Sequence, residues 1–303
     1  MPTEVRPYIP QQITVHLGSP NQAAENVTVS FPDYVKNVAS SEIYPTWEPS
    51  AIRANILAII SFALNRVYTE YYPSRGFPFN ITSSTAIDQK YIHGRDIFEN
   101  ISQVVDTIFN SYIRRRGLIE PLAAKFCNGT TTTCDGLSQW GSQELAQQGY
   151  NSVDILRHYY GDDIELVVNA PVSGLRTSYP GFPLRRGMEG ENVIRIQYML
   201  NRISQDYPAI PKIPTPLNGQ FDEATQQAVR RFQQIFSLTP DGVVGSSTWY
   251  KMVFLFVGIT NLSELASEGQ TVYQISYQSS GQLSEGDRSE GVRTIQYLLS
   301  VVA

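Results

Sequence analysis

Apolar residues recur at helical spacing in two widely separated parts of the chain. Residues 50–67 are almost wholly apolar or small, with only Arg53 and Arg66 charged. This run predicts a buried helix. Towards the C-terminus one apolar stripe predicts a second, amphipathic helix. The stripe consists of Val193, Ile196, Leu200 and Ile203.

Two further helices are expected after this stripe, and together the three form a small bundle over residues 184–256. Asp222 or Glu223 would occupy the first turn of the second helix, where negative charge is favoured. Ser246 or Ser247 would cap the third, short helix. Glycine turns at 217–221 and 240–245 separate the helices. The inward residues are expected to be Thr225, Ala228, Val229 and Phe232, followed by Trp249, Met252 and Val253.

The rest of the chain divides by composition. Residues 1–30 form a proline-punctuated lead with a strand-like run at 13–17, and residues 31–168 form a continuous mixed block. Proline, glycine and serine mark a linker at 169–183. The sequence therefore predicts an α+β N-terminal domain followed by the small all-α three-helix domain.

An internal repeat extends beyond the bundle. Residues 184–200 match residues 283–299 at a constant offset, across a second linker at 257–282. The second copy, at 283–303, stops after one helix. Either the natural chain continues past Ala303 or the second copy is vestigial. Because a lone amphipathic helix cannot bury its apolar face, we expect the former.

Composition narrows the classes of partner. The 303 residues suffice for about two domains, and 42% hydrophobic with 17% charged residues is an ordinary globular mixture. A net charge of −5 gives no indication of binding to nucleic acid or an anionic membrane. The N-terminus lacks the apolar region of a signal peptide, and the longest apolar run, 54–64, is too short to span a bilayer.

The cysteines leave alternatives open. Cys127 and Cys134 lie seven residues apart and could form a disulfide, remain as two free thiols, or supply half of a metal site. Two cysteines without a nearby histidine make a poor zinc site, which needs four ligands. A cysteine peptidase also fits poorly, because no histidine is close in sequence.

Two segments of the mixed block carry candidate chemistry. Glu42 lies beside Ile43, Tyr44 and Trp47, where poor solvation would favour the protonated form that a general acid requires, although such a glutamate is usually a cap or surface residue. Gly-Leu-Ser-Gln-Trp-Gly at 136–141 reads as a turn that opens a helix, with Trp140 expected in the core.

A short helix is expected next, with Ser152 as its N-cap and three apolar or aromatic residues inward. These are Ile155, Leu156 and Tyr159. His93 and His158 are interpreted as structural residues.

The bundle resembles the common peptidoglycan-binding-like domain. The shared features are Val-x-x-Ile-Gln on the first helix, Asn-Gly-x-Phe and Ala-Val-x-x-Phe-Gln through the second, and Asp-Gly-x-Val-Gly before Trp249. The resemblance implies binding to wall glycan or its peptide stems, without chemistry. The large aromatic residues are expected in the core.

The mixed block resembles the stage II sporulation protein D family, also called amidase-enhancer-like, over about 31–168. Its two signatures correspond to residues 34–64 and 136–160, and the family's catalytic glutamate falls on Glu42. Members are lytic transglycosylases, which cut the MurNAc–GlcNAc bond with one carboxyl group and leave a 1,6-anhydro end. The resemblance therefore implies Glu42 as acid and base. Tyr44, Ser138 and Gln139 are our predicted substrate contacts.

The block also departs from the family pattern. Some members hold zinc through cysteines and a histidine just after the long helix, but residues 79–91 have neither, and Thr82 and Asp88 fall near the ligand positions. We therefore predict no such metal and no cofactor. Thr133, Cys134 and Asp135 replace a Gly-His-Gly. A non-catalytic wall-binding protein and an enhancer of another wall enzyme remain alternatives.

The expected partner is therefore the peptidoglycan glycan strand. The expected location is the cell wall or spore envelope of a bacterium. Without a signal peptide, a spore-forming cell, a phage or an injection-type assembly would supply the route to the wall.

Overall fold

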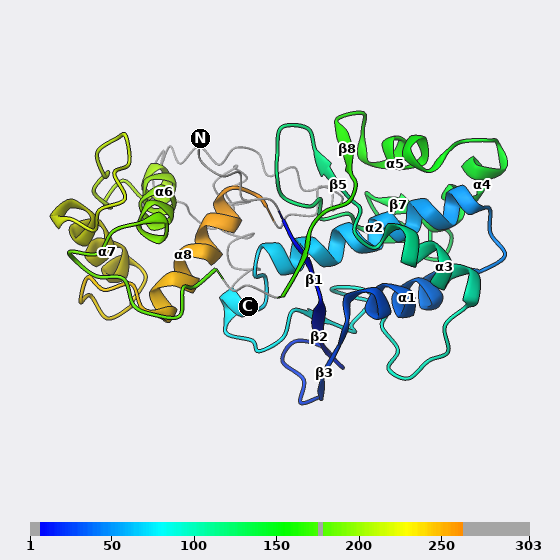
Figure 1. Ribbon diagram of the computed structural model, residues 1–303, viewed down its shortest axis with the longest axis horizontal. Coiled ribbons are helices and arrows are strands. Elements are labelled where there is room, and N and C mark those ends of the chain that lie inside the picture. The colour runs from blue at the N-terminus through cyan, green and yellow to red at the C-terminus, as the bar shows by residue number, and fades with distance from the viewer. Residues whose placement is uncertain (1–6, 175–177, 263–303) are drawn as a thin grey trace, which may run out of the picture. The chain divides into compact units, whose positions relative to one another are not determined.

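The computed structural model describes residues 7–174 and 178–262 (Figure 1). These residues contain two separate hydrophobic cores. One core belongs to a mixed α/β N-terminal part and the other to a three-helix C-terminal part. The fold class expected from the sequence is thus confirmed. The second repeat copy, at 283–303, lies outside the described residues.

The strands of the N-terminal part are short and form four small sheets. The central one has the order β3-β2-β4, with β2 antiparallel to β3 and parallel to β4. The others pair β1 with β9, β5 with β8, and β6 with β7. The bounds are β1 Ile9–Pro10, β2 Gln12–His16, β3 Asn26–Ser30, β4 Ile81–Thr82, β5 Tyr112–Arg115, β6 Phe126–Cys127, β7 Leu137–Ser138, β8 Ile164–Val167 and β9 Val172–Ser173.

A single apolar helix organises the N-terminal core. It is α2, Pro49–Tyr68, and it lies between α1 and α3 on one side and α5 and β8 on the other (Figure 1). The stretch 49–75 is long and apolar enough to cross a membrane, but 83% of its most apolar window is buried inside the protein. It is therefore the core helix of this part, as the apolar run at 50–67 predicts. The other helices are α1 Phe31–Glu42, η1 Pro73–Arg75, α3 Glu99–Ile108, α4 Gln139–Gln147 and α5 Ser152–Tyr160.

Strands of the N-terminal lead belong to the same core. Ile9, Ile13 and Val15 are fully buried within it, because β2 pairs with β3 just before α1 begins. Ser30 caps α1 by accepting a hydrogen bond from the Asp33 backbone N–H at 3.1 Å. The capped start fixes α1 against the sheet and so determines where its C-terminal end lies.

The C-terminal part consists of α6 Glu191–Asp206, α7 Glu223–Ile235 and α8 Ser246–Ile259. The apolar faces predicted for all three helices are buried. Asp222 caps α7 by accepting from the Thr225 backbone N–H at 2.8 Å, and Glu223 occupies the first turn, as expected.

Two predicted caps are wrong. The residue preceding α8 is Gly245, whose extended backbone starts the helix at Ser246 without a side-chain cap. The N-cap of α5 is Asn151 rather than Ser152, because its side chain reaches the backbone N–H groups of Val153 and Asp154. In both cases the helix begins one or two residues from the position that the serine pattern indicates.

Two buried glutamines hold the glycine turns of the three-helix part. Gln197 accepts from the Gly219 backbone N–H at 3.1 Å and donates to the Gln220 carbonyl at 2.9 Å. Gln233 accepts from the Gly242 N–H at 2.9 Å and donates to the Val243 carbonyl at 2.9 Å. Both glycines have positive φ, +68° and +75°, which glycine adopts without steric cost. Each side-chain amide thus satisfies a turn whose backbone groups face the protein interior.

Candidate active site

Glu42 is the last residue of α1, and its carboxylate is half-buried at the surface of the N-terminal part. Its Oε1 atom accepts a hydrogen bond from the Lys90 backbone N–H at 2.9 Å, and its Oε2 atom accepts from Gln139 Nε2 at 3.2 Å. Both oxygens accept hydrogen bonds here, and neither contact uses a proton of the carboxyl group.

The Lys90 contact depends on a loop that is held against α1. The Asn37 side chain forms two hydrogen bonds with the backbone of Ile92, of 2.7 and 3.0 Å. The Tyr34 hydroxyl donates to Gln89 Oε1 at 2.9 Å. Burial raises the pKa of Tyr34, so its hydroxyl keeps the donated proton at neutral pH. These contacts fix the backbone on both sides of Lys90.

The Gln139 contact depends on how α4 is attached to the core. The Ser138 hydroxyl caps α4 by accepting from the Gly141 N–H at 3.0 Å. One turn later, Asn55 of α2 donates to Ser142 Oγ at 2.8 Å. Gln143 Oε1 accepts from the Glu48 backbone N–H at 2.8 Å and so joins α4 to the segment that follows Glu42. The two sequence motifs, in which Gln139 lies 97 positions after Glu42, therefore meet at one carboxylate.

A cluster of three aromatic rings lies next to this contact. Tyr44, Trp47 and Trp140 have ring centroids 5.1 to 5.7 Å apart. The exposed fractions of Tyr44 and Trp140 are 56% and 36%, whereas Trp47 is 8% exposed. The expectation that Trp140 is a core residue is wrong. This end of α4 faces the core through Gln139, Ser142 and Gln143. Trp140 comes between these residues in the sequence but lies on the outward face of the helix.

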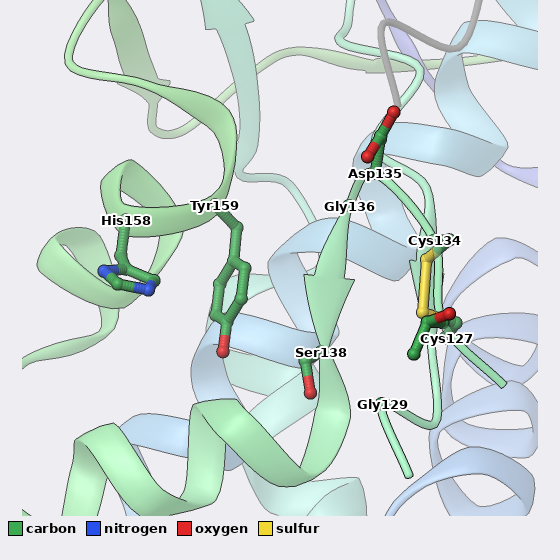
Figure 2. Close-up of a pocket in the computed structure, with 9 residues that line it drawn as sticks. Cys127, Gly129, Cys134, Asp135, Gly136, Ser138, His158 and Tyr159 are labelled. Atoms are coloured by element: carbon green, nitrogen blue, oxygen red, sulfur yellow. A yellow bond between two sulfur atoms is a disulfide. The ribbon is translucent and has the colours of Figure 1, made fainter. Parts of the chain in front are cut away.

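Ser138 lies beside a different hollow from Glu42. A cavity of about 380 Å³ opens between the loop that follows β6 and helix α5 (Figure 2). Side chains that line the cavity include Cys127, Cys134, Asp135, Ser138, His158 and Tyr159.

Cys127 and Cys134 are joined as a disulfide, which decides between the alternatives that the sequence leaves open. The bond closes the loop at the rim of the cavity (Figure 2). Cys127 also pairs in register with Ser138 through β6 and β7. The disulfide loop is therefore attached to the residue that caps α4.

Thr82 and Asp88 are brought together in a network of hydrogen bonds around the Asp88 carboxylate. The Asp88 side chain is fully buried and forms an ion pair with Arg66 Nε at 2.9 Å, and it accepts from Thr82 Oγ1 at 2.7 Å. Tyr72 donates to its second oxygen as well. Among residues 7–174 and 178–262, no three His, Cys, Asp or Glu side chains are grouped to hold a metal ion. The donor set at Asp88 thus suits a guanidinium rather than a metal.

The structure brings three of the four predicted site residues to one place. Glu42 and Gln139 are in contact, and Tyr44 stands two residues from Glu42 with its ring against Trp140. The hydroxyl of Ser138 is engaged in the α4 cap. Sequence reasoning missed the Lys90 contact because a backbone N–H leaves no trace in residue identity.

Comparison with known proteins identifies the C-terminal part. The family model of the peptidoglycan binding domain matches residues 189–252, which span α6, α7 and the first half of α8. A solved structure of the SleB N-terminal domain is similar at 29% identity and a TM-score of 0.22, and the match covers 26% of this chain and 97% of that one. No curated protein matches the chain. The chain therefore carries a peptidoglycan-binding domain.

Proposed function

We propose that this protein binds peptidoglycan and cleaves its glycan strands as a lytic transglycosylase, with Glu42 as the catalytic residue. The observation that carries the proposal is the contact between Glu42 and Gln139. These residues belong to the two motifs by which the N-terminal part resembles the stage II sporulation protein D family. Their meeting at one half-buried carboxylate, beside exposed aromatic rings, supports a substrate site there.

One carboxyl group suffices for the proposed reaction. The Glu42 acid donates its proton to the glycosidic oxygen as the bond to MurNAc C1 breaks, and the leaving GlcNAc keeps that proton as a hydroxyl. The resulting carboxylate then accepts the proton of the C6 hydroxyl of the same MurNAc, whose oxygen bonds to C1. The products are a 1,6-anhydro-MurNAc end and a free GlcNAc hydroxyl. A glycoside hydrolase, by contrast, typically uses two carboxylates.

The residues around Glu42 have separate parts in this proposal. Gln139 and the Lys90 N–H hold the two carboxylate oxygens in a fixed orientation. Tyr44 contacts the sugar on the exposed side. Ser138 sets the start of α4 and, from the neighbouring cavity, reaches a substituent of the strand. The peptidoglycan-binding domain retains the polymer, and the cell wall, including that of the spore envelope, is the proposed working location.

The second candidate is a wall-binding protein without catalytic activity, or one that enhances another wall enzyme. The observation that favours it is the extent of the family match, which covers the binding domain at 189–252 alone. Both candidates predict that the protein is recovered with wall material. They differ in whether glycan bonds are broken.

The deciding experiment is digestion of purified sacculi by the full chain, followed by mass spectrometry of the soluble products. Wild-type protein should release fragments that end in 1,6-anhydro-MurNAc. Glu42→Gln should abolish release while pelleting with sacculi as wild type does. Glu48→Gln is the matched control, because Glu48 is an exposed glutamate six residues away whose side chain makes no cap bond. Equal release by wild type and Glu42→Gln would exclude the proposed role of Glu42.

A further inference from the structure

We propose that Tyr44, Trp47 and Trp140 form a stacking platform for one sugar ring of the glycan strand, next to the bond that Glu42 acts on. The catalytic role of this platform rests on the proposed function, whereas its binding of sugar is independent of that function. The inference concerns a binding site in the N-terminal part, separate from the peptidoglycan-binding domain at 189–252.

The three rings have different degrees of burial, as a platform requires. Trp47 is 8% exposed and supports the other two, with its ring at 61° to that of Trp140 and 46° to that of Tyr44. Tyr44 and Trp140 present their surfaces to solvent. An exposed cluster of large aromatic side chains is unusual on a soluble protein unless it contacts a partner.

The polar ends of these rings indicate what kind of partner fits. Within the described residues, neither the Tyr44 hydroxyl nor the indole N–H of Trp47 or Trp140 has a hydrogen-bond partner in the protein. Tyrosine and tryptophan usually pair these groups when they are covered. A pyranose ring has an apolar C–H face that packs on an aromatic ring and a rim of hydroxyl and acetamido oxygens that accept from such donors. A purely apolar partner would leave all three donors unsatisfied.

The platform has a fixed position relative to Glu42. Tyr44 and Trp47 follow Glu42 in the chain, and Trp140 follows Gln139, which donates to Glu42. The Glu48 N–H bond to Gln143 ties the two segments together just beyond the rings. A sugar ring stacked on Tyr44 or Trp140 would therefore be a near neighbour, in the same glycan strand, of the glycosidic bond placed at the Glu42 carboxylate.

The test uses the full chain in the Glu42→Gln background, which prevents cleavage, and soluble peptide-free glycan strands as the probe. Of the three tryptophans in the chain, Trp249 is fully buried, so a change in acrylamide quenching reports on Trp47 and Trp140. Glycan should reduce quenching in a saturable manner. Tyr44→Ala leaves both reporters in place and should weaken the apparent affinity about tenfold. Tyr150→Ala, which removes an exposed tyrosine outside the cluster, should leave the affinity unchanged.

A second variant guards against loss of folding. Trp140→Phe keeps an aromatic face and should retain part of the affinity, with Trp47 as reporter, whereas Trp140→Ala should lose it while circular dichroism stays native. Unchanged affinity in both Tyr44→Ala and Trp140→Ala would overturn the platform. The platform would also be overturned if isolated stem peptide, but not glycan, reduced the acrylamide quenching. The same holds if the reduction in quenching followed protein concentration, which would indicate self-association.

The outcome is distinguishable from that of the proposed function. Glycan-dependent protection without any release of anhydro products would retain the platform and reject catalysis. Release that requires Glu42 but is indifferent to the aromatic variants would retain catalysis and reject the platform.

Discussion

Replacement of Gln233 by alanine should destabilise the three-helix part more than any exposed substitution on the same helix. Gln233 is 1% exposed, accepts from the Gly242 N–H and donates to Val243 O and Asp241 Oδ1, each at 2.9 Å. A hydrogen bond contributes about 1 kcal/mol net. Three lost bonds, with buried turn groups left unpaired, therefore predict a loss of about 3 kcal/mol in the free energy of unfolding. That is a large share of the roughly 5–15 kcal/mol that stabilises a typical domain.

Fluorine NMR of the full chain labelled with 5-fluorotryptophan can measure this loss, because Trp249 reports on the three-helix part and Trp47 and Trp140 report on the N-terminal part. In a urea titration the Trp249 resonance of Gln233→Ala should convert to its unfolded position at lower denaturant than in wild type. Gln227→Ala is the control, since Gln227 is exposed on α7 and bonds only to Glu223. A midpoint for Gln233→Ala equal to that of the control would refute the account of the glycine turn.

Three further predictions concern the N-terminal part. Asp88→Asn should lower its stability by about 3–5 kcal/mol in urea unfolding, because it leaves the Arg66 guanidinium buried without its counter-charge; a change below 1 kcal/mol would contradict this. Burial raises the pKa of Glu70 in the folded protein. The stabilisation from the protonated carboxyl is therefore complete below the ordinary glutamate pKa of about 4.3, and it is lost as the pH rises through the pKa of the folded protein. Glu70→Gln should therefore raise the melting temperature at pH 7 but not at pH 4, and equal shifts at both would exclude this cause. Gly141→Ala should cost about 1–3 kcal/mol, because the added methyl group meets the Tyr159 hydroxyl, and a thermal melt identical to wild type would show that Tyr159 moves freely.

Helices were predictable from the sequence because each long run has one dominant period. The apolar run at 50–67 corresponds to α2, and the stripe from Val193 to Ile203 corresponds to the buried face of α6. The strands were mostly not predictable. Five of the nine described strands have two residues, which is too short for alternation to show. The predicted cap of α5 was wrong because neighbouring side chains compete for the same backbone N–H groups, and that of α8 was wrong because Gly245 starts the helix without a side-chain cap.

The candidate site residues come from the sequence, whereas their arrangement comes from the fold. Resemblance to a family singled out Glu42 and Gln139, and only the fold brings them within hydrogen-bonding distance. Trp140 was misjudged because a large aromatic residue in an apolar motif is usually buried, and its sequence neighbours do not reveal which side of α4 meets α2. Ser138 stays a predicted substrate contact, and the fold adds that its hydroxyl caps α4.

The Cys127–Cys134 bond also constrains where the protein can mature. Thioredoxin and glutathione keep most cytosolic thiols reduced, whereas disulfides persist outside the cytoplasm. A polypeptide retained in the cytosol would therefore have an open loop at the cavity rim, next to the residue that starts α4. Recombinant protein should accordingly be made in an oxidising host or refolded with a redox couple, and the ratio of thiol to disulfide in native material would record which side of the membrane it came from.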